Sequence, residues 1–318
     1  MPDLGTGRPD PGAAATLDVG GVAVHVVRWA PSGPTSGRRV LLLHGLGAHT
    51  LSWEPPARAL ADRLDADVTA VDLVGFGRTR ALTHRATIDT QRRLVTSILE
   101  QHGPALVVGN SMGGSIGVAV TARDPGLVHG LVLVDPAVPH PRPALRDWGR
   151  TAWLAPLVVP GLGARLVTRR AERLGPDQLV DASLDTSLVR PDAVDPDLRR
   201  RMVALTVERL AWPDTPAAYA DAARSLVAYM TWGLSRDLGR ATRARPTLVL
   251  HGREDRLVAV AAVEHAARRH PARLEILDGV GHAPQLEAPG RVVDAIAGWL
   301  GERRLPGWDA PADATAAR

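Results

Sequence analysis

The residues best suited to chemistry in this chain form a glycine-flanked serine segment. Residues 109–113 read Gly-Asn-Ser-Met-Gly, a G-x-S-x-G pattern centred on Ser111. An apolar run precedes the segment and a helical pattern begins at Met112, so the serine falls on a predicted strand-to-helix turn. A sharp turn of this kind holds a serine hydroxyl away from its own helix, where a base can activate it. The context predicts that Ser111 is a nucleophile.

A glycine-rich turn at the start of a helix is also used to hold phosphate groups. A P-loop needs a lysine, however, and all 38 residues counted as Lys or Arg are arginines. A dinucleotide-binding turn needs G-x-G-x-x-G directly after a strand, which residues 109–113 do not provide. The pattern therefore favours the nucleophile.

A serine nucleophile needs a base with a pKa near neutrality, and histidine meets that requirement. Of the 11 histidines, His282 lies in a glycine-rich segment after the last predicted strand, at the sheet edge where ligands gather in α/β folds. His44 and His251 also end predicted strands, whereas His265 and His270 lie in or just after a helix. The order nucleophile, acid, histidine is typical of such hydrolases, and it favours His282.

The acid that orients the histidine should follow a strand and reach the second imidazole nitrogen. Asp255 stands just past a predicted strand and before His282, so we predict that it is the acid. Asp135 also ends a predicted strand and is the rival, and Glu254 is a neighbour of the same chemical type.

Acyl transfer also needs two donors aimed at the developing oxyanion. One should be the backbone N–H of Met112, at the positive end of its helix. The other should come from the loop 44–47, His-Gly-Leu-Gly, through the backbone N–H of Leu46.

Short Val- and Leu-rich runs alternate with helical patterns along the chain. The predicted strands are residues 16–19, 22–29, 40–43, 68–73, 106–108, 131–134, 247–250 and 273–277. The predicted helices are residues 55–64, 88–102, 112–123, 260–269 and 289–300. Alternation of this kind predicts a parallel sheet with right-handed crossovers.

The same pattern divides the chain into regions. We predict loose tails at residues 1–15 and 301–318, a core at 16–137 and 241–300, and a helical lid insertion at 138–240, which shows no buried strand. The insertion holds four of the eight tryptophans, which either pack it onto the core or line an apolar substrate pocket. These pocket candidates are Trp148, Trp153, Trp212 and Trp232.

Composition narrows the class of protein. With 45% hydrophobic and 23% charged residues the chain is an ordinary globular one, and without cysteine it has no disulfide or thiolate site. The arginine run 199–201 is interleaved with acidic residues, which indicates a solvated face and no nucleic-acid partner. No apolar stretch approaches about 18 residues, so we expect no membrane span. The first 15 residues do not form a secretory signal, and we expect a cytoplasmic protein.

Five ordered segments together resemble the α/β-hydrolase superfamily. They are residues 44–47, 71–79, 109–114, 252–255 and 281–287. The resemblance implies an α/β fold with a mostly parallel, eight-stranded sheet, helices on both faces and a helical lid insertion. Ser111 in place of Asp argues against epoxide hydrolases and haloalkane dehalogenases, which are otherwise similar.

Within that superfamily, the Gly-Asn-Ser-Met-Gly-Gly turn resembles those of simple esterases and of cofactor-free carbon–carbon bond hydrolases. The latter often carry Trp after the catalytic histidine, where this chain has Ala283. We therefore expect a serine hydrolase acting on a small-molecule apolar carboxylic ester, without metal or cofactor. The alternatives are carbon–carbon hydrolysis of a ring-cleavage diketone, perhydrolase chemistry, and a ligand-binding protein that has lost turnover.

Overall fold

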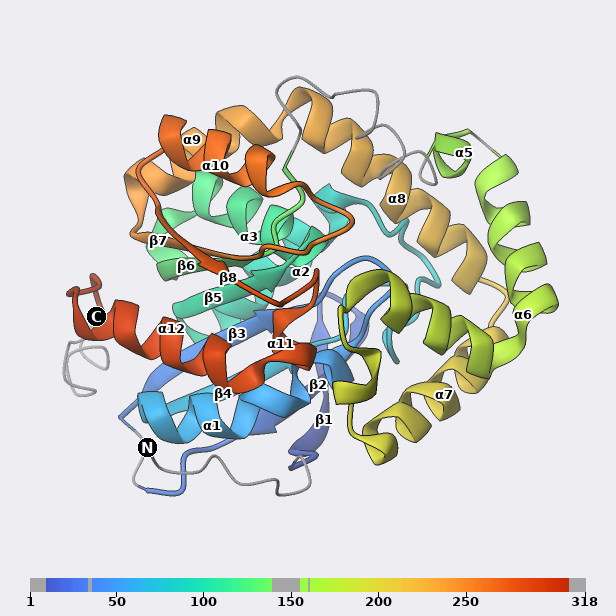
Figure 1. The fold of residues 1–318 in the computed structure, drawn as a ribbon, viewed down its shortest axis with the longest axis horizontal. Coiled ribbons are helices and arrows are strands. Elements are labelled where there is room, and N and C mark those ends of the chain that lie inside the picture. Colours follow the sequence, from blue (N-terminus) through green and yellow to red (C-terminus); the bar gives the residue numbers. More distant parts are fainter. Residues whose placement is uncertain (1–9, 34–35, 139–154, 160, 309–318) are drawn as a thin grey trace.

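The computed structural model describes residues 10–33, 36–138, 155–159 and 161–308. They contain an eight-stranded sheet with the order β1-β2-β4-β3-β5-β6-β7-β8 (Figure 1). The strands are β1 (Ala13–Val19), β2 (Val22–Trp29), β3 (Arg38–Leu43), β4 (Ala66–Val71), β5 (Ala105–Asn110), β6 (Val128–Val134), β7 (Thr247–Gly252) and β8 (Arg273–Leu277). The β1–β2 and β2–β4 pairs are antiparallel and all other neighbours are parallel, which confirms the predicted sheet.

Helices cover both faces of this sheet. One face carries α1 (Glu54–Leu64) and α12 (Pro289–Gly301), and the other carries α2 (Ile88–His102), α3 (Met112–Arg123), α9 (Leu234–Ala244) and α10 (Val260–Arg269) (Figure 1). Each helical layer buries its own apolar cluster against the sheet. The cluster on the side of α1 and α12 includes Trp53 and Trp299, and the cluster on the side of α3 includes Ile116. Because β5 is buried on both sides, the turn that follows it is held between these layers.

Between β6 and β7 the chain forms a group of helices beside the sheet. They are α5 (Ala155–Val158), α6 (Leu162–Ser187), α7 (Pro196–Leu210) and α8 (Thr215–Trp232), followed by α9. Helix α6 is interrupted at Gly175, which has φ 69°, just before Pro176. Helix α6 packs on both α7 and α8 (Figure 1), and α9 packs on α3. The predicted division into core and lid at residues 138 and 240 stays a prediction.

The ordered part of the chain extends into both predicted tails. Strand β1 starts at Ala13, and Asp10 accepts a hydrogen bond from Arg58 Nε at 2.7 Å, so part of the predicted tail 1–15 belongs to the sheet. At the other end, Leu305 and Trp308 are buried, and the Arg38 guanidinium lies 5.6 Å from the Trp308 ring centroid. Residues 1–9 and 309–318 lie outside the described residues.

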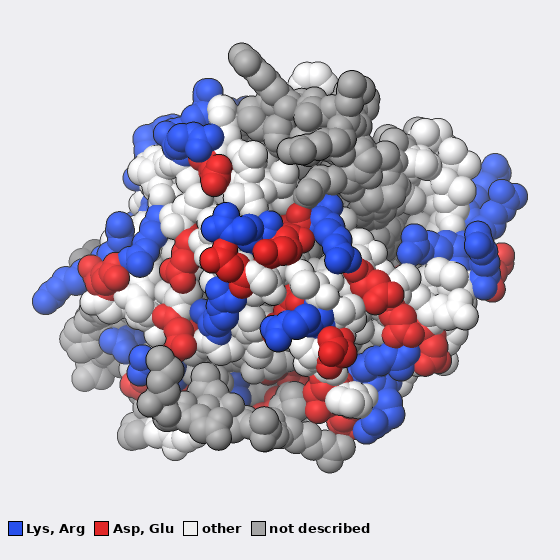
Figure 2. Space-filling model, in the orientation of Figure 1, with Lys and Arg blue, Asp and Glu red and all other residues white. Residues whose placement is uncertain are grey.

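The surface carries charges of both signs. Figure 2 shows arginines mixed with Asp and Glu across the visible face. In the run 199–201, Arg199 pairs with Asp181 and Arg200 with Asp197. The absence of a nucleic-acid partner stays a prediction. None of the helices in the described part of the chain is both long and apolar enough to cross a membrane.

The remaining short elements within the described ranges are three 3₁₀ turns and one short helix. Two 3₁₀ turns, η1 (Thr50–Trp53) and η2 (Pro125–Leu127), precede α1 and β6, and a third, η4 (Pro191–Ala193), precedes α7. Helix α11 (Pro284–Glu287) follows β8 after a glycine-rich loop. The carboxyl ends of β5, β6 and β7 and this loop meet at one edge of the sheet.

Candidate active site

Ser111 occupies the turn between β5 and α3 in a conformation that few residues adopt. Its backbone has φ 51° and ψ −114°, outside the regions that an L-residue ordinarily populates. Its N–H donates to the carbonyl of Val134 at 2.9 Å, which ties the turn to the end of β6. A strained, well-anchored residue at such a position is typical of a functional site.

The two flanking glycines are required by close backbone approach. A Cβ on Gly109 would lie 2.4 Å from the carbonyl oxygen of Gly113, and one on Gly113 would lie 2.3 Å from the carbonyl oxygen of Leu43. Both distances are far inside van der Waals contact. The G-x-S-x-G spacing therefore follows from the way α3 lies against β5 and β3.

His282 and Asp255 come from different loops and form a direct hydrogen bond. His282 Nδ1 and Asp255 Oδ2 are 2.7 Å apart, and both side chains are buried. The other carboxylate oxygen of Asp255 accepts the N–H groups of Leu257 at 2.7 Å and Val258 at 2.9 Å. Burial alone would raise the pKa of Asp255, but His282, His251 and the Val258 N–H outweigh burial and hold that pKa at about 2. Asp255 is thus a carboxylate at neutral pH.

The histidine loop is tied to the residue before Ser111. Asn110 Nδ2 donates to the carbonyl oxygens of His282 and of Val134, each at 3.1 Å. Glu287 on α11 accepts a hydrogen bond from the N–H of Gly281 at 2.8 Å. The N–H of His282 donates to the backbone carbonyl oxygen of Ser187, at the end of α6, at 2.6 Å. These bonds bring the His282 loop beside the turn that carries Ser111.

The rival histidines have other partners. His44 Nδ1 lies 2.8 Å from the carbonyl of Gly45, and its Nε2 accepts the N–H of Leu73 at 3.1 Å. Burial lowers the pKa of His44 to about 4, so the imidazole is neutral at pH 7. Both of its ring nitrogens have backbone hydrogen-bond partners. His251 Nε2 lies 3.2 Å from the carbonyl of Val258, within the loop that holds Asp255.

Asp135, the rival acid, lies next to Asp255. It is fully buried with φ 44°, and its Oδ1 accepts the N–H of Gly252 at 2.9 Å. Asp135, Asp255 and His282 each place one potential metal-ligand atom within 4.8 Å of the others. Among the described residues this is the group of His and acidic side chains that lies close enough to hold a metal ion. We assign no metal to this set, because hydrogen bonds within the chain account for His282 Nδ1 and for both oxygens of Asp255.

The predicted oxyanion donors lie on the two segments that meet at Ser111. Met112 is the first residue of α3, where a backbone N–H has no partner inside the helix. The loop that carries Leu46 packs on the turn, since a Cβ on Gly45 would lie 3.3 Å from Ser111 Cβ. At its far side, Tyr219 of α8 lies against Gly47, where a Cβ would come within 2.8 Å of the tyrosine ring.

The four tryptophans proposed to line a pocket have different positions. Trp148 and Trp153 lie outside the described residues. Trp212 is half-buried, with the Arg80 guanidinium 4.8 Å from its ring centroid. Trp232 is 84% exposed at the end of α8, which is not the position of a pocket wall.

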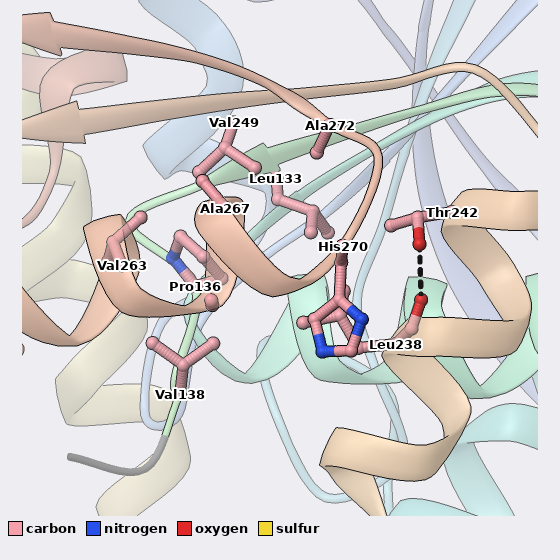
Figure 3. A pocket seen from close by; sticks show the side chains of 11 residues that line it. Leu133, Pro136, Val138, Leu238, Thr242, Val249, Val263, Ala267, His270 and Ala272 are labelled. Atoms are coloured by element: carbon pink, nitrogen blue, oxygen red, sulfur yellow. Dashed lines mark hydrogen bonds between the residues drawn. The ribbon is translucent and has the colours of Figure 1, made fainter. Parts of the chain in front are cut away.

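A small apolar pocket lies elsewhere, between α9, α10 and the sheet (Figure 3). Leu133, Leu238, Val263 and the ring of His270 line it. Ser111, Asp255 and His282 are not among its lining residues. It is therefore separate from the candidate active site.

Sequence reasoning missed three residues that shape the site. Asn110 and Glu287 were seen only as parts of motifs, yet they hold the histidine loop in place. Tyr219 of the insertion lies against Gly47, in the loop that is predicted to supply an oxyanion donor. For Asn110 and Glu287 a usable signal was a polar residue inside an otherwise apolar motif, whereas Tyr219 carried none.

Comparison with known proteins identifies the class. Residues 40–295 match the sequence profile of the alpha/beta hydrolase family. Lipase LipV of Mycobacterium tuberculosis is 30% identical over 289 residues, covering 89% of this chain and 99% of that protein. The chain therefore belongs to the alpha/beta hydrolase family and is a lipase- or esterase-like enzyme.

Two further matches define the range of the family. Pimeloyl-[acyl-carrier protein] methyl ester esterase of Nitrosomonas europaea is 27% identical over 263 residues, covering 82% of this chain and 95% of that protein. The crystal structure of haloalkane dehalogenase DatA from Agrobacterium tumefaciens C58 aligns with TM-score 0.73 and 18% identity, over 92% of this chain and 97% of that one. The second likeness supports the fold alone.

Proposed function

We propose that this protein hydrolyses apolar carboxylic esters through an acyl-enzyme on Ser111, with His282 as base and Asp255 as the acid that orients it. The observation that carries the proposal is the 2.7 Å hydrogen bond between His282 Nδ1 and Asp255 Oδ2, beside the strained turn at Ser111. That bond leaves Nε2 as the nitrogen that can receive the serine proton.

The reaction proceeds in two halves. Ser111 Oγ attacks the ester carbonyl carbon while its proton passes to His282 Nε2. The N–H groups of Leu46 and Met112 stabilise the resulting oxyanion, which collapses and expels the alcohol with the proton from His282. Water, deprotonated by His282, then attacks the acyl carbonyl and releases the carboxylic acid and Ser111.

The substrate class rests on the surroundings of Ser111 and on the relatives. Two relatives are named as a lipase and a methyl ester esterase, which supports an ester. The helices between β6 and β7 form the lid in this proposal, and they place the ring of Tyr219 against the oxyanion loop at Gly47. An aromatic wall at that point favours an apolar acyl group.

A series of p-nitrophenyl esters from acetyl to octanoyl tests the proposal. Each methylene that enters an apolar pocket contributes about 0.8 kcal/mol, so kcat/KM should rise about threefold to fourfold per carbon until the pocket is filled. Ser111→Ala should lower kcat by several orders of magnitude without unfolding the protein.

Two substitutions on α8 locate the pocket. Tyr219→Ala should move the optimum toward longer acyl chains, because it removes a ring that borders the oxyanion loop. Trp232→Ala, at an exposed position on the same helix, is the matched control and should leave the profile unchanged. A flat profile unaltered by Tyr219→Ala would reject the apolar pocket. Turnover of a ring-cleavage diketone or of peroxide in preference to every ester would replace ester hydrolysis by one of the alternatives.

A further inference from the structure

Four buried titratable side chains lie together behind the proposed Ser111 site. Asp135 directly follows β6, His251 lies in β7, Asp255 follows β7, and His282 lies in the loop before α11. Asp135 Oδ1 is 3.3 Å from His251 Nδ1, and Asp255 Oδ2 is 3.7 Å from His251 Nε2. One potential ligand atom of Asp135 and one of Asp255 also lie within 4.8 Å of each other. Two carboxyl groups therefore share one buried space.

The donors around the two carboxyl groups are unequal. Asp255 accepts hydrogen bonds from the N–H groups of Leu257 and Val258 and from His282 Nδ1. Asp135 accepts one backbone N–H, from Gly252, and its Oδ2 receives no donor from the described residues. Hydrogen bonds from donors favour the ionised form of a carboxyl group, so the negative charge belongs on Asp255.

Asp135 Oδ2 can hydrogen-bond to Asp255 only if one of the two carboxyl groups carries a proton, because an ionised carboxylate can only accept. Like charges at this separation in a buried site cannot both be maintained. Burial, followed by the charge of Asp255, raises the pKa of Asp135 well above its usual range, and Glu287 adds to this effect. Burial lowers the pKa of His251, which therefore brings no positive charge to balance a second carboxylate.

We propose that Asp135 is a protonated positioning residue that donates a hydrogen bond from its carboxyl group to Asp255 and stands in reserve as a second acid for His282. The proposal rests on the proposed function of Ser111 and His282. Asp135 holds the orientation of the Asp255 carboxylate, and Asp255 in turn holds His282. When the charge at residue 255 is removed, the repulsion that keeps Asp135 protonated disappears. Asp135 then ionises within 4.8 Å of a His282 ring nitrogen and orients it in place of Asp255.

A double-mutant cycle on kcat tests both parts. Asp135→Asn in the native background should lower kcat about fivefold, since an amide can replace the donated hydrogen bond in part. Asp255→Ala leaves space for Asp135 to approach His282 and should lower kcat about 100-fold. The double variant should lose about 10⁴-fold, the loss typical when no acid orients the histidine. Asp135→Asn should thus lower kcat about 100-fold in the Asp255→Ala background. Substitution of a residue with a merely structural role would lower kcat by the same factor in the native and the Asp255→Ala backgrounds.

Asp237→Asn is the matched control for this cycle. Asp237 is a buried carboxyl group on α9 that accepts a hydrogen bond from Tyr229 Oη at 3.1 Å, apart from His282. Its substitution should change kcat by the same factor in both backgrounds. Equal factors for Asp135→Asn in the two backgrounds would overturn the reserve role.

A second measurement does not depend on turnover or on the folding of Asp255→Ala. The infrared spectrum of the native protein at neutral pH should contain the carbonyl stretch of a buried protonated carboxyl group, and Asp135→Asn should lack it. Its absence from the native protein would overturn the protonated Asp135. Covalent labelling of Ser111 by a fluorophosphonate in the native protein is measured alongside. Labelling without the infrared band rejects this inference alone, whereas failure of labelling rejects the proposed function.

Discussion

At the scale of single residues, the site combines groups whose pKa values are displaced in opposite directions. Asp255 is held as an anion with a pKa of about 2, while the pKa of its neighbour Asp135 is raised. Environments that separate the pKa values of adjacent carboxyl groups are typical of sites that move protons. The arrangement gives His282 one anionic partner rather than two.

The raised pKa of Asp135 predicts how stability depends on pH. The unfolded chain releases the proton of residue 135 above about pH 4, whereas the folded protein retains it. The stability due to this residue is therefore full below about pH 4 and is lost as the pH rises through the folded pKa. Asp255, His251, His282 and Glu287 surround it, and Asp255 stays ionised across this range because its pKa is about 2.

Asp135→Asn removes this proton linkage. The free energy of unfolding of the variant, measured in urea, should improve relative to the native protein as the pH is raised from about 4 to 7. A difference that does not change with pH would contradict a raised pKa for Asp135.

The sequence predicts the residues that belong to ordered motifs and misses those whose partners are distant. Ser111, Asp255 and His282 follow from a strand-to-helix turn, the ends of strands and the order of groups along the chain. The contact of Asn110 with the carbonyl of His282 joins residues 172 positions apart, and no local pattern encodes it. The proton on Asp135 likewise depends on the packing of β6 against β7.

At the scale of elements, the turn between β5 and α3 decides the geometry of the site. Helix α3 lies so close to β3 that no side chain fits at Gly113. The same closeness puts the first N–H groups of α3 at the turn that carries Ser111. Stability and the position of Ser111 therefore depend on the same contact.

Gly113→Ala should destabilise the protein by about 1–3 kcal/mol, the usual cost of overpacking, because its Cβ would meet the carbonyl of Leu43. Gly298→Ala is the matched control, since a Cβ there in α12 meets nothing within 4 Å. It should stabilise the helix by up to about 1 kcal/mol. Urea unfolding measures both. Equal effects of the two substitutions would contradict the close approach of α3.

Elements with a regular apolar period are predicted well from the sequence. Helices α2, α3 and α10 begin and end where their pattern does, because α2 and α10 each bury one apolar face and α3 is apolar and buried on all sides. The ends of the chain were predicted less well. Residues near Ala13 and Trp308 lack periodicity: the strand that starts at Ala13 depends on pairing with β2, and Trp308 contacts the distant Arg38.

At the scale of the whole molecule, an ion pair joins the helices between β6 and β7 to the rest of the chain. Arg201 of α7 donates through Nη1 to Glu54 of α1 at 2.6 Å, and through Nη2 to the other carboxylate oxygen. Glu54 is buried, so loss of its partner leaves an uncompensated charge.

Arg201→Ala should therefore lower the free energy of unfolding by about 2 kcal/mol and speed proteolytic cleavage between α6 and α8. Arg200→Ala, whose exposed side chain pairs with the partly buried Asp197 of the same helix, should change stability by less than about 0.5 kcal/mol. Similar effects of the two neighbours would show that the Glu54 contact does not anchor this part of the molecule.

The identity of the nucleophile is tested most directly by a fluorophosphonate probe, with the labelled peptide identified by mass spectrometry. An activated serine displaces the leaving group from phosphorus, so the native protein should carry one label on Ser111. Ser111→Ala should carry none, and His282→Ala should label far more slowly. A folded native protein that remains unlabelled, or one labelled at another residue such as Ser115, would contradict the assignment of Ser111 as the nucleophile.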